Sequence, residues 1–227
     1  MSTHLEPGVG IKLQDRSIKI QEDQSGTWVD TFTVDKGGNV FVGGNLSYDP
    51  PPGTVLEMLM SQANGSTINV SSGSYETQNV TATQNLSTSY SVVNGSMLSY
   101  KPPPNTTRLQ YQFHFHWYGT GSSGGMYHMT LYVDGTEVQD SRQTEIQRAA
   151  STTQQVGVFQ YTLQIGGSED IANGVISSWD TNKTIELRAR EYHSSSWAVT
   201  LHHKNWWNGG GAPTLHRRPS LAITAVR

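Results

Sequence analysis

The sequence predicts an all-β protein with an N-terminal stalk of short strands, followed by a jelly-roll-like antiparallel β-sandwich head. Only 15 % of the 227 residues are charged, 34 % are hydrophobic and 23 are glycine, which is typical of many short strands with one solvated face. Apolar and polar residues alternate repeatedly after Thr54, and no segment keeps the 3.6-residue apolar period of an amphipathic helix.

The alternation in the head predicts about nine strands, a number that suits a jelly roll or a related sandwich. They are expected near residues 54–62, 66–71, 89–100, 107–118, 126–134, 153–166, 183–193, 196–207 and 218–226. The best helical candidate, residues 143–150, is short and lacks an apolar stripe.

The chain is predicted to have two parts, an anchor and stalk in residues 1–49 and a head in residues 50–227. Residues 9–46 contain short apolar alternations separated by glycine-rich turns, and three prolines, residues 50–52, stiffen the connection to the head. Strands this short bury little core within one chain, which favours a fibre stalk shared by three copies. The alternative is a loop-rich edge of a domain.

Two β-hairpins are predicted in the head. Residues 113–117 and 127–133 alternate in phase around a glycine-rich turn, and pairing Trp117 with Tyr127 gathers their apolar side chains on one face. A second hairpin is expected between residues 185–189 and 199–201.

The first hairpin would place three histidines on its polar face. Its register puts His116 opposite His128, with His114 two residues along the same strand. Imidazole is a common metal ligand and titrates near neutral pH, so this patch suits a zinc or nickel site or a pH-sensitive interface. The alternative is a passive polar face of neutral histidines. His202 and His203 point to opposite sides of their strand and cannot both join one site.

A tryptophan-rich segment is the candidate receptor contact. Trp206, Trp207 and Asn208 precede three glycines, and an exposed indole beside an amide suits stacking on a sugar ring. The alternative is that both indoles are packed, one in the core and one at a subunit interface.

Composition and motifs also exclude several functions. The net charge is −3, and the basic cluster His216, Arg217 and Arg218 is too small to follow a nucleic-acid backbone. No apolar run reaches the ~20 residues of a membrane span, and residues 1–10 lack the pattern of a signal peptide. There is no cysteine, and no nucleophile elbow, phosphate loop, metal pair or dinucleotide fingerprint occurs. We therefore expect no cofactor and no enzymatic activity.

Several segments resemble fibre proteins of marine phages and algal viruses. Residues 37–57, from Gly37-Gly-Asn-Val to Pro-Gly-Thr-Val-Leu-Glu57, are similar to the stalk-to-head junction of those proteins. The similar head segments are Asn85-Leu-Ser-Thr-Ser89, Ser99-Tyr-Lys-Pro-Pro-Pro104, Leu131-Tyr-Val-Asp-Gly135, Arg188-Ala-Arg-Glu-Tyr192 and Pro219-Ser-Leu-Ala-Ile-Thr-Ala-Val226. The resemblance covers about residues 37–227, and the head also broadly resembles the trimeric jelly rolls of the tumour necrosis factor and C1q kind.

This resemblance implies a virion structural protein, a homotrimeric fibre, spike or capsid decoration protein. We expect it to be made in the host cytoplasm without a signal peptide and to act in the virion. Residues 1–36 would join it to other virion proteins, and the head would contact host-surface glycans. One alternative is a carbohydrate-binding β-sandwich without viral context. The other is a glycan-cleaving enzyme, whose two carboxylates would come from distant positions.

Overall fold

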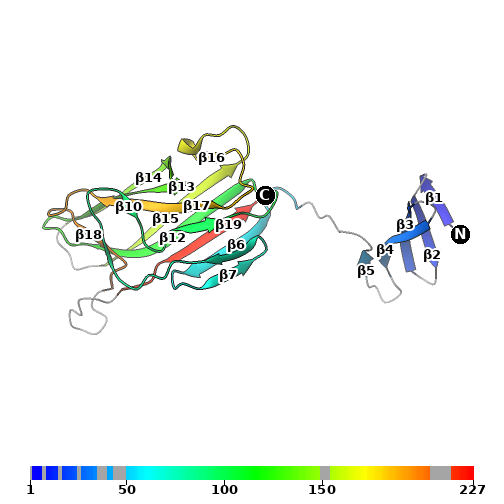
Figure 1. Cartoon of the computed structure of the whole chain (residues 1–227), viewed down its shortest axis with the longest axis horizontal. Helices are drawn as coiled ribbons and strands as arrows, with labels where there is room; N and C mark the ends of the chain where they lie inside the picture. The colour runs from blue at the N-terminus through cyan, green and yellow to red at the C-terminus, as the bar shows by residue number, and fades with distance from the viewer. Residues whose placement is uncertain are drawn as a thin grey trace. The chain divides into compact units, whose positions relative to one another are not determined.

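The computed structural model describes residues 2–6, 9–14, 17–24, 27–34, 40–42, 50–148, 154–204 and 216–227 (Figure 1). The chain divides into two compact units, Met1–Pro50 and Pro51–Arg227, where the sequence predicted 1–49 and 50–227. Within the described residues, no helix is long and apolar enough to cross a membrane.

The first unit is an antiparallel meander in which each strand pairs with the next one along the chain. Its strands are β1 (Ser2–Glu6), β2 (Val9–Gln14), β3 (Ser17–Gln24), β4 (Thr27–Val34) and β5 (Val40–Val42). Three or more strands that pair within one chain do not need other copies to complete their hydrogen bonds. The sharing of a stalk core by three copies concerns side-chain burial, and it stays a prediction.

The head is an antiparallel β-sandwich, as predicted. One sheet, called the β13 sheet, contains β10 (Ser91–Val92), β11 (Leu98–Tyr100), β17 (Lys183–Glu191), β13 (Gly124–Val133) and β14 (Thr136–Arg148). The other, called the β12 sheet, contains β16 (Val175–Ile176), β15 (Gln155–Ile165), β12 (Arg108–Gly119), β18 (Val199–Leu201), β9 (Gln84–Asn85), β19 (Ser220–Val226) and β6 (Val55–Gln62). A small hairpin of β7 (Thr67–Val70) and β8 (Gly73–Glu76), and the 3-10 turn η1 (Ile171–Asn173), complete the head.

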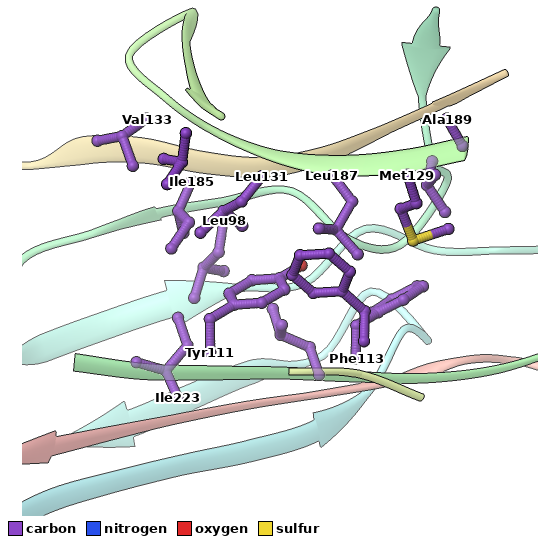
Figure 2. Close-up of a cluster of buried hydrophobic side chains, with 14 of the residues drawn as sticks. Leu98, Tyr111, Phe113, Met129, Leu131, Val133, Ile185, Leu187, Ala189 and Ile223 are labelled. Atoms are coloured by element: carbon purple, nitrogen blue, oxygen red, sulfur yellow. The ribbon is translucent and has the colours of Figure 1, made fainter. Parts of the chain in front are cut away.

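The core lies between these two sheets. In Figure 2, Tyr111 and Phe113 on β12 face Leu131 and Leu187 on the opposite sheet, and all four side chains are fully buried. This arrangement explains the alternation in the sequence, because every second residue of each strand must face inward.

Both predicted hairpins are wrong. Strand β12 pairs with β15, β18 and β19, whereas β13 pairs with β14 and β17, so the two strands lie in opposite sheets. Residues 185–189 and 199–201 are likewise divided, because β17 belongs to the β13 sheet and β18 to the β12 sheet. Trp117 still meets Tyr127, but across the core, with ring centroids 5.0 Å apart.

The crossing between β12 and β13 depends on two glycines. A Cβ atom on Gly119 would lie 2.2 Å from the backbone nitrogen of Gly125, so any side chain there would collide with the returning chain. The alternation of apolar and polar residues determines which side chains of a strand face inward. The same alternation occurs in two strands paired in one sheet and in two strands that face each other across a core, so it could not distinguish these arrangements.

One long strand was not predicted at all. Strand β14 has 13 residues and lies at the edge of the β13 sheet. Only Val138, Ser141 and Gln147 of its residues are buried, so it lacks the apolar alternation that marks the other strands. The Asp134-Gly135 turn that precedes it has positive φ at both residues, as expected for a tight hairpin turn.

Candidate functional site

The outward side of the β12 sheet is the most distinctive surface of the head. In the sheet register Met60 of β6 lies beside Ala222 of β19, which lies beside Gln112 of β12 and then Gln160 of β15. We call this surface the outer face. Its members are Val55, Met58, Met60, Gln62, Arg108, Gln110, Gln112, His114, His116, Val156, Val158, Gln160, Thr162, Gln164, Ser220, Ala222, Thr224 and Val226.

The outer face carries almost no formal charge but many exposed apolar side chains. The members of the outer face include one arginine, Arg108, and no lysine, aspartate or glutamate. Five of the eight exposed large hydrophobic side chains in the described residues belong to it, namely Val55, Met58, Met60, Val156 and Val158. A neutral surface with exposed apolar groups is typical of a contact with another protein.

The outward side of the β13 sheet has a different chemistry. Arg142 and Glu137 form an ion pair at 2.8 Å, and Arg188 and Glu186 form another at 2.7 Å. The Arg188 guanidinium also lies 4.2 Å from the centre of the Tyr132 ring. This charged side is typical of a solvated surface, so the neutrality of the outer face is a local property.

A groove of about 400 Å³ opens at the end of the outer face where His114 and His116 lie. Its walls come from β6, β12, β15, β19 and the segment before β19. The lining residues are Met60, Gln62, Gln112, His114, Phe115, His116, Val156, Arg217, Arg218, Ser220, Leu221 and Ala222. None of these side chains is a carboxylate, so the groove is neutral to basic.

The basic end of the groove is built where two strands share one side of β12. Strand β18 pairs with residues 117–119 and β19 with residues 108–114. His202 occupies the gap. Its backbone N–H donates to the His116 carbonyl at 2.6 Å, and the backbone N–H of Arg217 donates to the His202 carbonyl at 2.8 Å. These bonds fix Arg217 beside β12.

His116 lies at the groove between a glutamine and an arginine. Burial, together with the nearby Arg217 guanidinium, lowers the pKa of its imidazole. The Gln154 amide contacts His116 Nδ1.

His202 and His203 have structural roles. His202 is fully buried edge-on against Phe113, and burial lowers the pKa of its imidazole to about 4. The His203 ring packs on Tyr118 with centroids 4.3 Å apart, and its own pKa is lowered by burial. Both rings are therefore neutral packing elements.

The predicted patch of three histidines does not form. His114 and His116 lie on the outer face of the β12 sheet, whereas His128 lies on β13, with its Nδ1 2.8 Å from Thr144 Oγ1 of β14. The error came from pairing β12 with β13. In the parts of the chain that are described, no group of three histidine, cysteine or acidic side chains is placed to hold a metal ion.

The predicted receptor contact lies in the tryptophan segment. Trp206, Trp207 and Asn208 lie outside the described residues, so their contact with a sugar stays a prediction. The outer face and the groove were not predicted. A signal for them exists in the sequence, since the outward positions of residues 108–118 and 156–164 are mostly glutamine, threonine, histidine and valine instead of charged residues.

The chain matches no protein-family model and no curated protein. Among solved structures, it aligns with a chain of the "Structure of infectious bursal disease virus Gx strain" at 9 % sequence identity and a TM-score of 0.25. The alignment covers 100 % of this chain and 74 % of that one. At so low a TM-score two chains need not share a fold.

Proposed function

We propose that the protein is a virion structural protein, a homotrimeric fibre, spike or capsid decoration protein whose head assembles through its outer face. The observation that carries the proposal is the neutral, apolar character of that face. The sequence segments similar to viral fibre proteins support the virion setting. The proposed occupant of the face is a second copy of this chain.

The chemistry of the outer face suits contact between identical copies. Glutamine and threonine side chains donate and accept, and the Gln112 amide already donates to Gln160 at 2.8 Å within one chain. Such a surface meets copies of the same chain without repulsion between like charges, which a charged face would suffer.

The distribution of apolar residues suits a closed ring. A cyclic trimer needs two different contact surfaces on each copy. The outer face offers two apolar strips, Val55, Met58 and Met60 on β6 and Val156 and Val158 on β15, separated by the polar residues of β12 and β19. In the proposed trimer the strip on β6 of one copy packs against the strip on β15 of the next.

The size of the face indicates that the head does not act alone. Four strands about 4.8 Å apart and about 25 Å long cover roughly 500 Å² in projection, and in a cyclic trimer each neighbour contacts only one side of that face. A standard interface buries about 800 Å² of accessible surface on each partner, more than one apolar strip offers. We therefore propose that residues 1–49 add contacts within the assembly, and that residues 1–36 also join the protein to its virion partners.

Light scattering of the purified chain tests the assembly. The expected mass is three times the 25.0 kDa of one chain. Met60→Glu places a charge on a side chain that is 64 % exposed on the β6 strip, and should yield monomers. Met60→Gln keeps the side chain neutral and should stay trimeric. Tyr192→Glu adds the same charge at an exposed position outside the outer face and should also stay trimeric. A wild type that is monomeric at micromolar concentration would contradict the proposal.

Particle incorporation tests the virion assignment. A variant that lacks residues 1–36 should leave the head folded but be missing from purified particles, which mass spectrometry of the particles measures. Normal incorporation of the truncated protein would show that the anchor lies elsewhere.

A carbohydrate-binding β-sandwich without viral context is the second candidate, and the groove favours it. Its polar and apolar walls and its volume of about 400 Å³ suit a small ligand. The two candidates differ in their oligomeric state, since a binding module of this kind works as a monomer.

A further inference from the structure

We propose that the groove binds the acidic group, a carboxylate or a sulfate, of a saccharide. The proposal deepens the host-contact role and rests on it for the natural source of the ligand. All lining residues come from one chain, so binding needs no second copy. Met60 and Val156 also belong to the apolar strips of the proposed trimer, so the ligand and the neighbouring copy compete for these two side chains.

The charge of the groove selects an anion. Arg217 and Arg218 are both exposed and both line it, and none of its described lining residues is a carboxylate. The whole chain carries a net charge of −3, so this basic region is a local exception to an acidic protein. A guanidinium presents paired N–H donors that match two oxygens of a carboxylate or sulfate.

The remaining walls select a sugar as the carrier of that anion. Gln62, Gln112 and Ser220 supply amide and hydroxyl groups that both donate and accept, as sugar hydroxyls require. Met60 and Val156, which are 64 % and 67 % exposed, add apolar surface for the carbon-bound faces of a ring. The mixture of apolar walls with a few polar groups, and the volume, are typical of small-molecule sites.

The size of the basic region argues against a nucleic acid. Binding to a nucleic-acid backbone uses a row of lysine and arginine contacts to successive phosphates. Here Arg217 and Arg218 lie at the groove, at one end of the outer face, and the residues of that face beyond the groove are neutral as far as Arg108. The site therefore suits one acidic group, not a polyanion.

Calorimetric titration of the full chain tests the proposal. The probes are sulfated lactose, sialyllactose and lactose, which share a neutral core and differ in the acidic group. Both acidic sugars should bind at least about 10-fold more tightly than lactose, because each charge-assisted contact adds about that much. Their affinity should fall as salt rises from about 50 to about 300 mM.

Matched variants assign the binding to the groove. Arg217→Gln with Arg218→Gln should weaken both acidic sugars by about 10- to 100-fold. Arg108→Gln removes one positive charge from the same face, about 20 Å from His114 along β12, and should leave the affinity unchanged, which makes it the matched control for the single Arg218→Gln variant. Circular dichroism checks folding, and the single Arg218→Gln variant serves if the double variant does not fold.

Three results would overturn the proposal: equal binding of lactose, no binding of any probe at millimolar concentration, or undiminished binding by the arginine variants. Light scattering of the same samples measures the oligomeric state, so a failure of saccharide binding can be distinguished from a failure of the proposed trimer. A ligand that binds and converts trimers to monomers would support both the groove and the interface, because Met60 and Val156 belong to both.

Discussion

Glu57 provides the sharpest test of how the outer face is held in place. The residue is only 7 % exposed, and its carboxylate accepts four hydrogen bonds. The donors are Ser71 Oγ at 2.6 Å, and the Ser72 N–H, Ser72 Oγ and Tyr100 hydroxyl at 2.7 Å each. These bonds tie β6, which carries Met58 and Met60, to the β7–β8 turn and to β11.

Replacing this carboxylate should cost much of the head's stability. Four hydrogen bonds at about 1 kcal/mol net each give about 4 kcal/mol for Glu57→Ala. In a domain of this size 1 kcal/mol shifts the melting temperature by about 2–4 °C, so a loss of about 8–16 °C is expected. Glu57→Gln keeps one acceptor oxygen and should cost about half as much.

The same network predicts an acid-sensitive head. Burial raises the pKa of Glu57, but the hydrogen bonds from Ser71, Ser72 and Tyr100 outweigh it and hold the pKa below its ordinary value of 4.5. A carboxyl whose folded pKa is lowered contributes its stability above the unfolded pKa and loses it as pH falls through the folded pKa. The contribution should be complete above about pH 5 and be lost progressively as the pH falls below the ordinary value of 4.5 and through the lowered folded pKa.

Thermal melting by circular dichroism between pH 7 and pH 3 measures both effects. Glu57→Gln should flatten the wild-type loss of melting temperature in acid, whereas Glu76→Gln, on exposed β8, should leave it unchanged. If Glu57→Ala melts within about 1 °C of the wild type, the four bonds do not stabilise the head and the reasoning fails.

Three further predictions concern other parts of the head. Burial lowers the pKa of His202 to about 4 from an ordinary 6.5, so acidification through this range should destabilise the head by about 3 kcal/mol in melting experiments, and His202→Phe should remove that dependence. Gly157→Ala would place a Cβ 2.4 Å from the buried Phe115 ring and should cost about 1–3 kcal/mol in urea unfolding; a neutral effect would contradict this packing. Trp206→Ala and Trp207→Ala should have different effects: loss of an inward indole should lower the free energy of unfolding by about 3–5 kcal/mol, whereas loss of an outward one should reduce cell binding alone. Equal, large losses of stability in both variants would mean that both indoles serve packing and not ligand contact.

The positions of most head strands could be predicted because burial imposes alternation on them. The strand expected near residues 107–118 is β12, Arg108–Gly119, and the one expected near 54–62 is β6, Val55–Gln62. Strand β14 was not predicted, because an edge strand with solvent on much of its surface needs no apolar alternation.

Strand partners could not be predicted in the same way. The apolar residues of β12 and β13 meet in either arrangement, and only the crossing at Gly119 and Gly125 places the strands in opposite sheets. The supposed patch of His114, His116 and His128 depended on that choice. The groove needs four separate segments of chain, and sequence spacing alone does not bring Arg217 beside His116.

The shared side of β12 has a consequence for how this head can vary. Strands β18 and β19 pair one after the other with β12, and His203, after β18, forms a bridge with His216, before β19. Strand β18 also pairs with β9, and β19 with β6. The register of both strands is therefore set by pairing within the sheet and not by the length of chain that joins them, so insertions between His203 and His216 should leave the sheet aligned.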